Sequence, residues 1–76
     1  MSDKGVEKLV YMANQIGKFF ASQGADAAVA GTANHIRQFW DPRMRAQIGA
    51  YVQSGGHGLD PAVRDAIASL SAAPQG

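Results

Sequence analysis

The sequence contains no cysteine and carries few charges, and each of these absences excludes a class of site. Without a thiol, the chain has no disulfide framework, no thiolate zinc site and no iron–sulfur ligation. Its only histidines, His35 and His57, are far apart and lack a carboxylate at ligand spacing, so we expect no metal or other cofactor in this chain. The formal net charge of +1 is also much lower than that of the strongly basic domains that bind nucleic acids.

Large apolar side chains are scarce as well. Of the 35 hydrophobic residues 14 are alanine, while Leu, Ile, Val and Phe together number 15. A chain below about 80 residues rarely obtains more than about 3–5 kcal/mol from its core, and natural chains of this size add a disulfide, a metal or a partner. Because disulfide and metal are excluded, the 76 residues predict one small, marginally stable domain that completes its burial on another protein chain.

Long hydrophobic runs are absent. No segment approaches the roughly 18 apolar residues that cross a bilayer. The charged N-terminal segment is not followed by the apolar run of a signal peptide. We therefore expect no membrane partner and a cytoplasmic location.

Apolar residues recur every three or four positions in four segments, which is typical of amphipathic helices. No segment alternates apolar and polar residues as a strand does. The pattern predicts an all-α fold, a single-domain bundle of about four short helices over residues 4–70, with a flexible C-terminal tail over residues 71–76. The predicted helices cover residues 4 to about 22, 25–39, 42 to about 53 and 61 to about 70.

Turn signals separate these helices. Asp41-Pro42 and Asp60-Pro61 each combine an N-cap with a proline at the first helical position. The glycines between Ser54 and Gly58 predict a flexible break. Met12 and Phe19 widen the apolar stripe of the first helix, which predicts that this helix is covered on more than one side.

Three of the four arginines, Arg37, Arg43 and Arg45, lie within nine residues. Arg37 falls near the end of a predicted helix, where a cation is favourable, whereas Arg43 and Arg45 fall in the first turn of the next, where it is not. Either Asp41 or Asp26 pairs with these two arginines, or a carboxylate of another chain binds them in bidentate geometry. A third hypothesis is a small nucleic-acid-binding module that uses all three arginines, although the tight junction between the two helices argues against it.

Other polar and aromatic residues also leave alternatives open. Asn14 and Gln15 are either solvated or fix the register of the first helix against a partner's backbone. His35 is expected to be structural or to lie at the rim of an interface. So small a core has little room for six aromatic side chains, so we expect some of them to face a partner. These are Tyr11, Phe19, Phe20, Phe39, Trp40 and Tyr51.

Catalytic templates are missing from the sequence, so we expect no enzyme activity in this chain. Three segments, however, resemble the delta subunit of the NAD-dependent formate dehydrogenases. They are KLVYMANQI at residues 8–16 followed by Phe19-Phe20, HIRQFWDPRMR at residues 35–45, and GLDPAV at residues 58–63. The resemblance runs from about residue 8 to about residue 70, and residues 39–45 are its most specific part.

The resemblance implies a non-catalytic accessory subunit of a cytoplasmic complex that oxidises formate to carbon dioxide and reduces NAD. Other subunits of that family carry a molybdenum or tungsten bis-pterin cofactor, iron–sulfur clusters and FMN, and bind NAD. The small subunit would bind and stabilise the catalytic alpha subunit or assist its maturation, and when isolated it would be able to self-associate. The predicted partner-binding residues are Asn14, Gln15, Phe19, His35, Phe39, Trp40, Asp41, Arg43 and Arg45.

Overall fold

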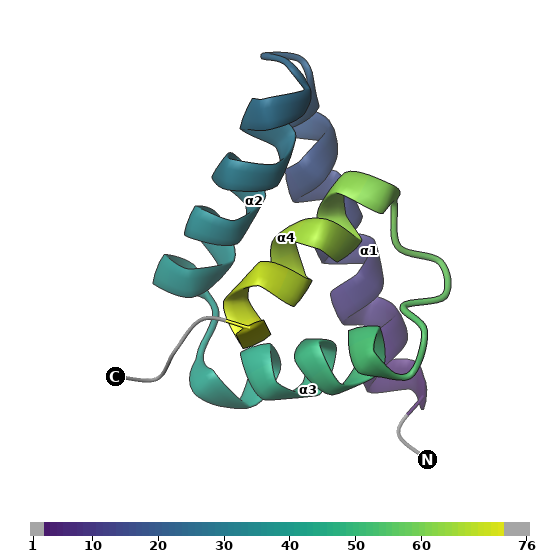
Figure 1. The fold of residues 1–76 in the computed structure, drawn as a ribbon. Coiled ribbons are helices and arrows are strands. Elements are labelled where there is room, and N and C mark those ends of the chain that lie inside the picture. Colours follow the sequence, from purple (N-terminus) through teal and green to yellow (C-terminus); the bar gives the residue numbers. More distant parts are fainter. Residues whose placement is uncertain (1–2, 73–76) are drawn as a thin grey trace.

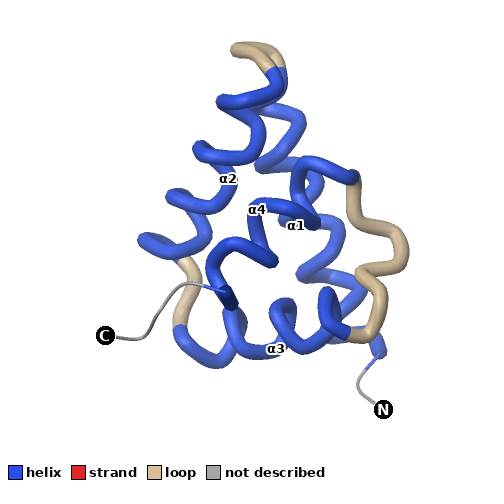
Figure 2. The backbone as a smooth tube through the Cα atoms, viewed as in Figure 1, coloured by secondary structure: helices blue, strands red, loops and turns tan. Residues whose placement is uncertain are grey.

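The computed structural model describes residues 3–72, which form four helices joined by short loops. This part of the chain contains no strand (Figure 2), which confirms the predicted all-α class. None of its helices is long and apolar enough to cross a membrane. The helices are α1 (Asp3–Ala21), α2 (Ala25–Phe39), α3 (Pro42–Gln53) and α4 (Pro61–Ala72).

The helices α1 and α2 form an antiparallel hairpin, and the other two helices pack around it (Figure 1). The hairpin turn contains Gly24, whose φ of 121° is open to glycine and strained for other residues. In the view of Figure 1, α3 lies across the end of the hairpin where α1 begins and α2 ends. The last helix, α4, packs mainly against α2 and also contacts α1 and α3.

The predicted helix boundaries are close to those of the structure, with one correction at the C-terminal end. The helix α4 continues to Ala72, two residues beyond the predicted end, so the predicted tail begins too early. Ser71 and Ala72 are compatible with a helix, and the first strong stop signal is Pro74, which disfavours the α conformation at the residue before it. Residues 73–76 of the predicted tail lie outside the described residues.

The predicted cap of α3 is confirmed. The side chain of Asp41 accepts a hydrogen bond from the backbone N–H of Met44 at 2.8 Å, and Pro42 occupies the first turn. Only Trp40 and Asp41 separate α2 from α3, and the extended backbone of Trp40 turns the chain sharply. This short junction fixes the corner between the two helices.

A small core lies between the four helices. Its buried members come from every helix and from the loops before α3 and α4, and three of them, Ala13, Ile36 and Ile48, have no exposed surface. Leu59, the residue before Asp60 at the start of the last helix, is buried in this cluster. The cluster consists of Leu9, Ala13, Ile36, Trp40, Ile48, Leu59, Val63 and Ile67.

Candidate partner-binding surface

The side of α1 that carries Phe19 faces away from α4. Gly17 lies against α4, because a Cβ on Gly17 would be 2.3 Å from Cγ2 of Val63. Phe19 is two residues further along the chain, which places it about 200° round the helix axis. Its ring makes an edge-to-face contact with the ring of Phe20, at 5.0 Å between centroids. Phe20 in turn packs on α2, where a Cβ on Gly31 would be 2.4 Å from its ring.

The corresponding side of α2 extends this apolar surface. Gly31, His35 and Phe39 are spaced by four residues, so they lie on one side of α2, the side where Gly31 meets Phe20. Because α1 and α2 are antiparallel (Figure 1), residues before Phe20 lie beside residues after Gly31. We call the resulting surface the α1–α2 strip; its members are Met12, Ile16, Phe19, Phe20, His35 and Phe39.

The two ends of the α1–α2 strip are the most exposed. Phe39 is 71% exposed and Phe19 is 64% exposed, whereas the four members between them are half-buried. The rings of His35 and Phe39 are stacked at a tilt, with their centroids 4.7 Å apart. These two phenylalanines and Tyr11, which is 66% exposed, therefore lie outside the core, and that some aromatic side chains face a partner stays a prediction.

Trp40 requires a correction. It was predicted as a partner-binding residue, but it is only 5% exposed and belongs to the core cluster. The α2–α3 corner turns its indole inward, where it contributes a large part of the limited apolar volume. Phe39, one residue earlier, takes the outward position. Of this adjacent aromatic pair, only Phe39 has an exposed ring.

Asn14 also requires a correction, because its amide binds a loop of its own chain. Its Nδ2 donates to the carbonyl of Gly58 at 3.0 Å, and its Oδ1 accepts from the backbone N–H of Asp60 at 3.0 Å. The hydroxyl of Tyr51 donates to the carbonyl of His57 in the same loop. The glycine-rich segment, predicted as a flexible break, is thus held by side chains from α1 and α3. Asn14 does fix register, but against the α3–α4 loop rather than against a partner.

We expect Asn14→Ala to lower the free energy of unfolding by about 1–3 kcal/mol, because the loop groups at Gly58 and Asp60 lose their partner. Urea denaturation followed by circular dichroism measures this change. The adjacent Gln15→Ala is the control, since Gln15 is exposed and should shift stability by less than about 0.5 kcal/mol. Equal stability of the two variants would show that the Asn14 bridge contributes nothing.

The three clustered arginines have different surroundings. Arg37 donates to Oδ1 of Asn34 at 2.6 Å within its own helix. Arg43 is exposed, and Arg45 is half-buried with an Nε that has no hydrogen-bond partner. Among the described side chains neither Arg43 nor Arg45 forms an ion pair, so the expected pairing with Asp41 or Asp26 is not found there.

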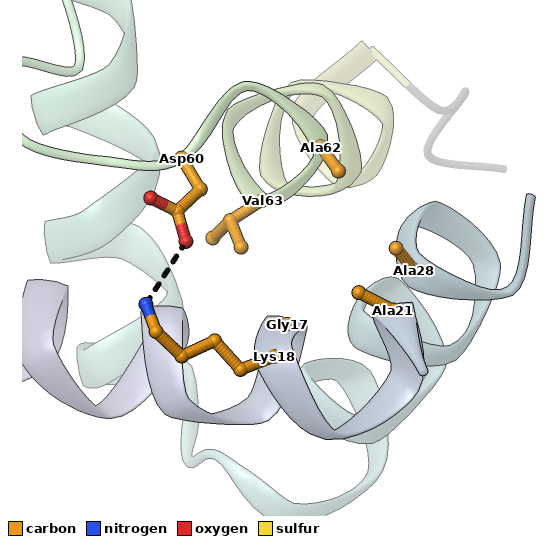
Figure 3. Close-up of a pocket in the computed structure, with 7 residues that line it drawn as sticks. All are labelled: Gly17, Lys18, Ala21, Ala28, Asp60, Ala62 and Val63. Carbon is orange, nitrogen blue, oxygen red and sulfur yellow. Dashed lines mark ion pairs between the residues drawn. The ribbon is translucent and has the colours of Figure 1, made fainter. Parts of the chain in front are cut away.

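A small apolar pocket lies between α1, α2 and α4 (Figure 3). It has a volume of about 90 Å³ and is lined by Gly17, Lys18, Ala21, Ala28, Asp60, Ala62 and Val63. Beside it, Nζ of Lys18 and a carboxylate oxygen of Asp60 are 3.5 Å apart. Both side chains are about half-exposed or more, so this pair contributes little to stability. The pocket has room for a single aliphatic group and brings no reactive groups together beyond this ion pair.

Comparison with protein families identifies the chain. Residues 8–67 match the family model of the NADH-dependent formate dehydrogenase delta subunit FdsD. The chain belongs to this family. The match includes the whole α1–α2 strip, the α2–α3 corner and the loop that Asn14 holds. No curated protein and no solved structure matches the chain.

The donor set of this chain does not fit an iron–sulfur cluster. Iron–sulfur clusters are held by cysteine thiolates, and the sequence has none. Within residues 3–72, no three His, Asp or Glu side chains lie close enough to hold a metal ion. The side chains best placed to contact another molecule are instead the exposed rings of the α1–α2 strip.

Sequence reasoning missed several members of this surface. Met12, Ile16 and Phe20 are not among the predicted partner-binding residues, and Met12 and Ile16 also pack against the core cluster. The sequence does contain a signal for them. Met12, Ile16 and Phe19 are spaced by four and three residues, and they widen the apolar stripe beyond what one neighbouring helix covers. The predicted positions Gln15, Phe19, His35, Phe39, Asp41 and Arg43 all retain exposed surface, and their role at a partner stays a prediction.

Proposed function

We propose that this chain is a non-catalytic accessory subunit of a cytoplasmic, NAD-dependent formate dehydrogenase. In that complex it binds and stabilises the catalytic alpha subunit, which carries the molybdenum or tungsten cofactor. The iron–sulfur clusters, FMN and the NAD site are assigned to other subunits. The observation that carries this proposal is the match of residues 8–67 to the delta-subunit family.

The physical character of the chain supports a binding role. Two phenylalanines on the α1–α2 strip are more than 60% exposed in a domain whose core has few large apolar residues to spare. Buried aromatic anchors supply much of the binding free energy of protein interfaces. Burying these two rings on a larger subunit would stabilise the complex and the small domain together.

Several polar side chains, including the predicted site residues Asn14 and Asp41, hold the fold. Asn14 bridges to the α3–α4 loop, and Asp41 caps α3. Lys18 and Asp60 pair with each other, and Arg37 and Gln38 both donate to Asn34. These contacts support an accessory subunit rather than an enzyme. A part in maturation of the alpha subunit would use the same contact, at an earlier stage.

The proposal is tested by tagging the chain at its own locus and purifying it from cells grown with formate. We expect the formate dehydrogenase alpha subunit to co-elute after nuclease treatment, because the association is between proteins. Deletion of the gene is expected to lower the amount of assembled, active complex. Absence of the alpha subunit from the eluate would overturn the proposal, and loss of all bound material on nuclease treatment would favour the nucleic-acid alternative.

Timing separates the two accessory roles. A permanent subunit is expected to co-elute with complex that already contains its cofactor and oxidises formate. A maturation factor is expected to co-elute mainly with alpha subunit that lacks the cofactor. Metal analysis of the co-purified alpha subunit distinguishes them.

A further inference from the structure

We propose that the α1–α2 strip is the contact surface of this chain, and that it fits a partner surface with an apolar groove bordered by carboxylates. This inference rests on the proposed function, because it assigns that surface to the contact within the complex. It commits to a partner other than a second copy of the chain. Three features support it: the exposed rings, the distribution of charge around them and the poor fit of the strip to itself.

The apolar part of the strip has the form of a ridge along a helix pair. Phe19 and Phe39 stand out at its ends, and half-buried side chains such as Ile16 and His35 lie between them. The His35 and Phe39 rings already contact each other, so the second anchor is partly ordered before binding. Pre-ordered anchors lose less conformational entropy when they bind. A groove that accepts one ring at each end would match this ridge.

One exposed cation lies beside the strip on α1, and a second lies in the first turn of α3, shortly after the strip ends at Phe39. Lys8 is exposed one turn before Met12, on the same side of α1. Arg43 is exposed four residues after Phe39, and it forms no ion pair with the described side chains. Both cations are therefore free to meet carboxylates of a partner, and Arg43 could do so in bidentate geometry.

Apart from Asp41, the described carboxylates lie away from the strip. Asp26 is nine residues before His35, which places it on the opposite side of α2, and Glu7 is about 140° round α1 from Met12. Asp60 pairs with Lys18, and Asp65 belongs to α4. Asp41 is the one carboxylate at the corner, and it caps α3. The border of the strip is thus basic, which selects an acidic partner by charge complementarity.

A second copy fits this border poorly. A symmetric dimer brings the same patch of both subunits together. Packing strip on strip would place Lys8 and Arg43 near their own copies or near each other, without a carboxylate on the strip to compensate. Like charges juxtaposed across an interface weaken it. The strip therefore suits a different chain with acidic groups at the rim of its groove.

The test measures binding of the purified full chain to formate dehydrogenase complex prepared from a strain that lacks it. We expect Phe19→Ala and Phe39→Ala each to raise the Kd at least about tenfold, as for anchor residues of an interface. Arg43→Glu and Lys8→Glu should each raise the Kd about tenfold at low salt, and the wild-type Kd should rise with ionic strength. Circular dichroism of each variant verifies that the exposed substitutions leave the fold intact.

Matched controls lie on the same helices outside the strip. Tyr11→Ala removes an equally exposed aromatic ring from the polar side of α1, which also carries Lys18. Arg37→Glu reverses a charge on the side of α2 that carries Asn34. Both variants are expected to bind within about twofold of the wild type.

Each outcome decides a different statement. If the wild type and the control variants bind the complex and the strip variants do not, the inference is supported. If the wild type binds and the strip variants bind equally well, the assignment of the strip as the contact surface is overturned and the proposed function stands. The same holds if the control variants lose binding as much as the strip variants do. Failure of the wild-type chain to bind overturns both. A wild-type homodimer that Phe39→Ala dissociates, with binding to the complex unchanged, assigns the strip to a second copy and overturns the inference.

Discussion

Trp40→Ala is expected to unfold the isolated domain. The indole is 5% exposed and packs in the core cluster, and truncation of a buried Trp typically costs about 3–5 kcal/mol. A domain of this size has about 3–5 kcal/mol of stability from its core in total. The loss is therefore about as large as the stability itself. Far-ultraviolet circular dichroism at 25 °C, with a urea titration of the wild type for reference, measures it.

Phe39→Ala is the matched control for Trp40→Ala. The two residues are neighbours and both are aromatic, but Phe39 is 71% exposed. We expect Phe39→Ala to keep the helical spectrum and a urea midpoint close to that of the wild type. A Trp40→Ala variant that is as stable as Phe39→Ala would contradict the buried position of the indole. The same pair separates folding from binding, because only Phe39→Ala should weaken the complex while the domain stays folded.

Gly17→Ala is the second substitution with a large expected effect. A Cβ at this position would be 2.3 Å from Cγ2 of Val63, whose branched side chain is stiff and only 1% exposed. The helix α4 must then shift away from α1, and overpacking of this kind costs about 1–3 kcal/mol or more. Alanine regains about 1 kcal/mol of helix propensity. We expect a net loss of up to about 2 kcal/mol in the free energy of unfolding, measured by urea denaturation.

Two further variants isolate the close approach of α1 and α4. Gly5→Ala makes the same change in the same helix, where the added Cβ meets only Nε2 of Gln47 at 3.4 Å, so we expect stabilisation of up to about 1 kcal/mol. In a Val63→Ala background the clash is relieved, and Gly17→Ala should no longer destabilise. If Gly17→Ala lowers the free energy of unfolding by the same amount in that background, the destabilisation does not come from the Gly17–Val63 contact.

The sequence predicted the local structure of the chain well because the signals for it are local. The prolines after Asp41 and Asp60 mark the first turns of α3 and α4, and the structure begins both helices at those prolines. The bounds of α2 agree at both ends, since Gly24 and the Asp41-Pro42 junction are strong stop and start signals. The family resemblance seen in residues 8–16, 35–45 and 58–63 is likewise a property of the linear sequence, and the family match confirms it.

The candidate site was predicted less well, because its residues depend on how the helices pack. Asn14 was considered as a contact to a partner, but the tertiary fold brings the loop at Gly58, 44 residues away in the chain, within hydrogen-bond distance. Hydropathy treats Phe39 and Trp40 alike. The direction of the α2–α3 corner decides that one ring is outside and the other inside. Exposure of an aromatic side chain is a property of the whole packing arrangement, so no local pattern specifies it.

The sequence by itself determined the helical class, the positions of the turns, the absence of thiol chemistry and the family of this protein. Each of these follows from residue types and spacings along the chain. Only the tertiary structure decided which apolar residues the small core uses and which remain on the α1–α2 strip. The physical reason is that Gly17 and Gly31 allow α4 and Phe20 to approach closely, and this sets the side of the helix pair that α4 covers. The opposite side, with Phe19 and Phe39 at its ends, is left exposed.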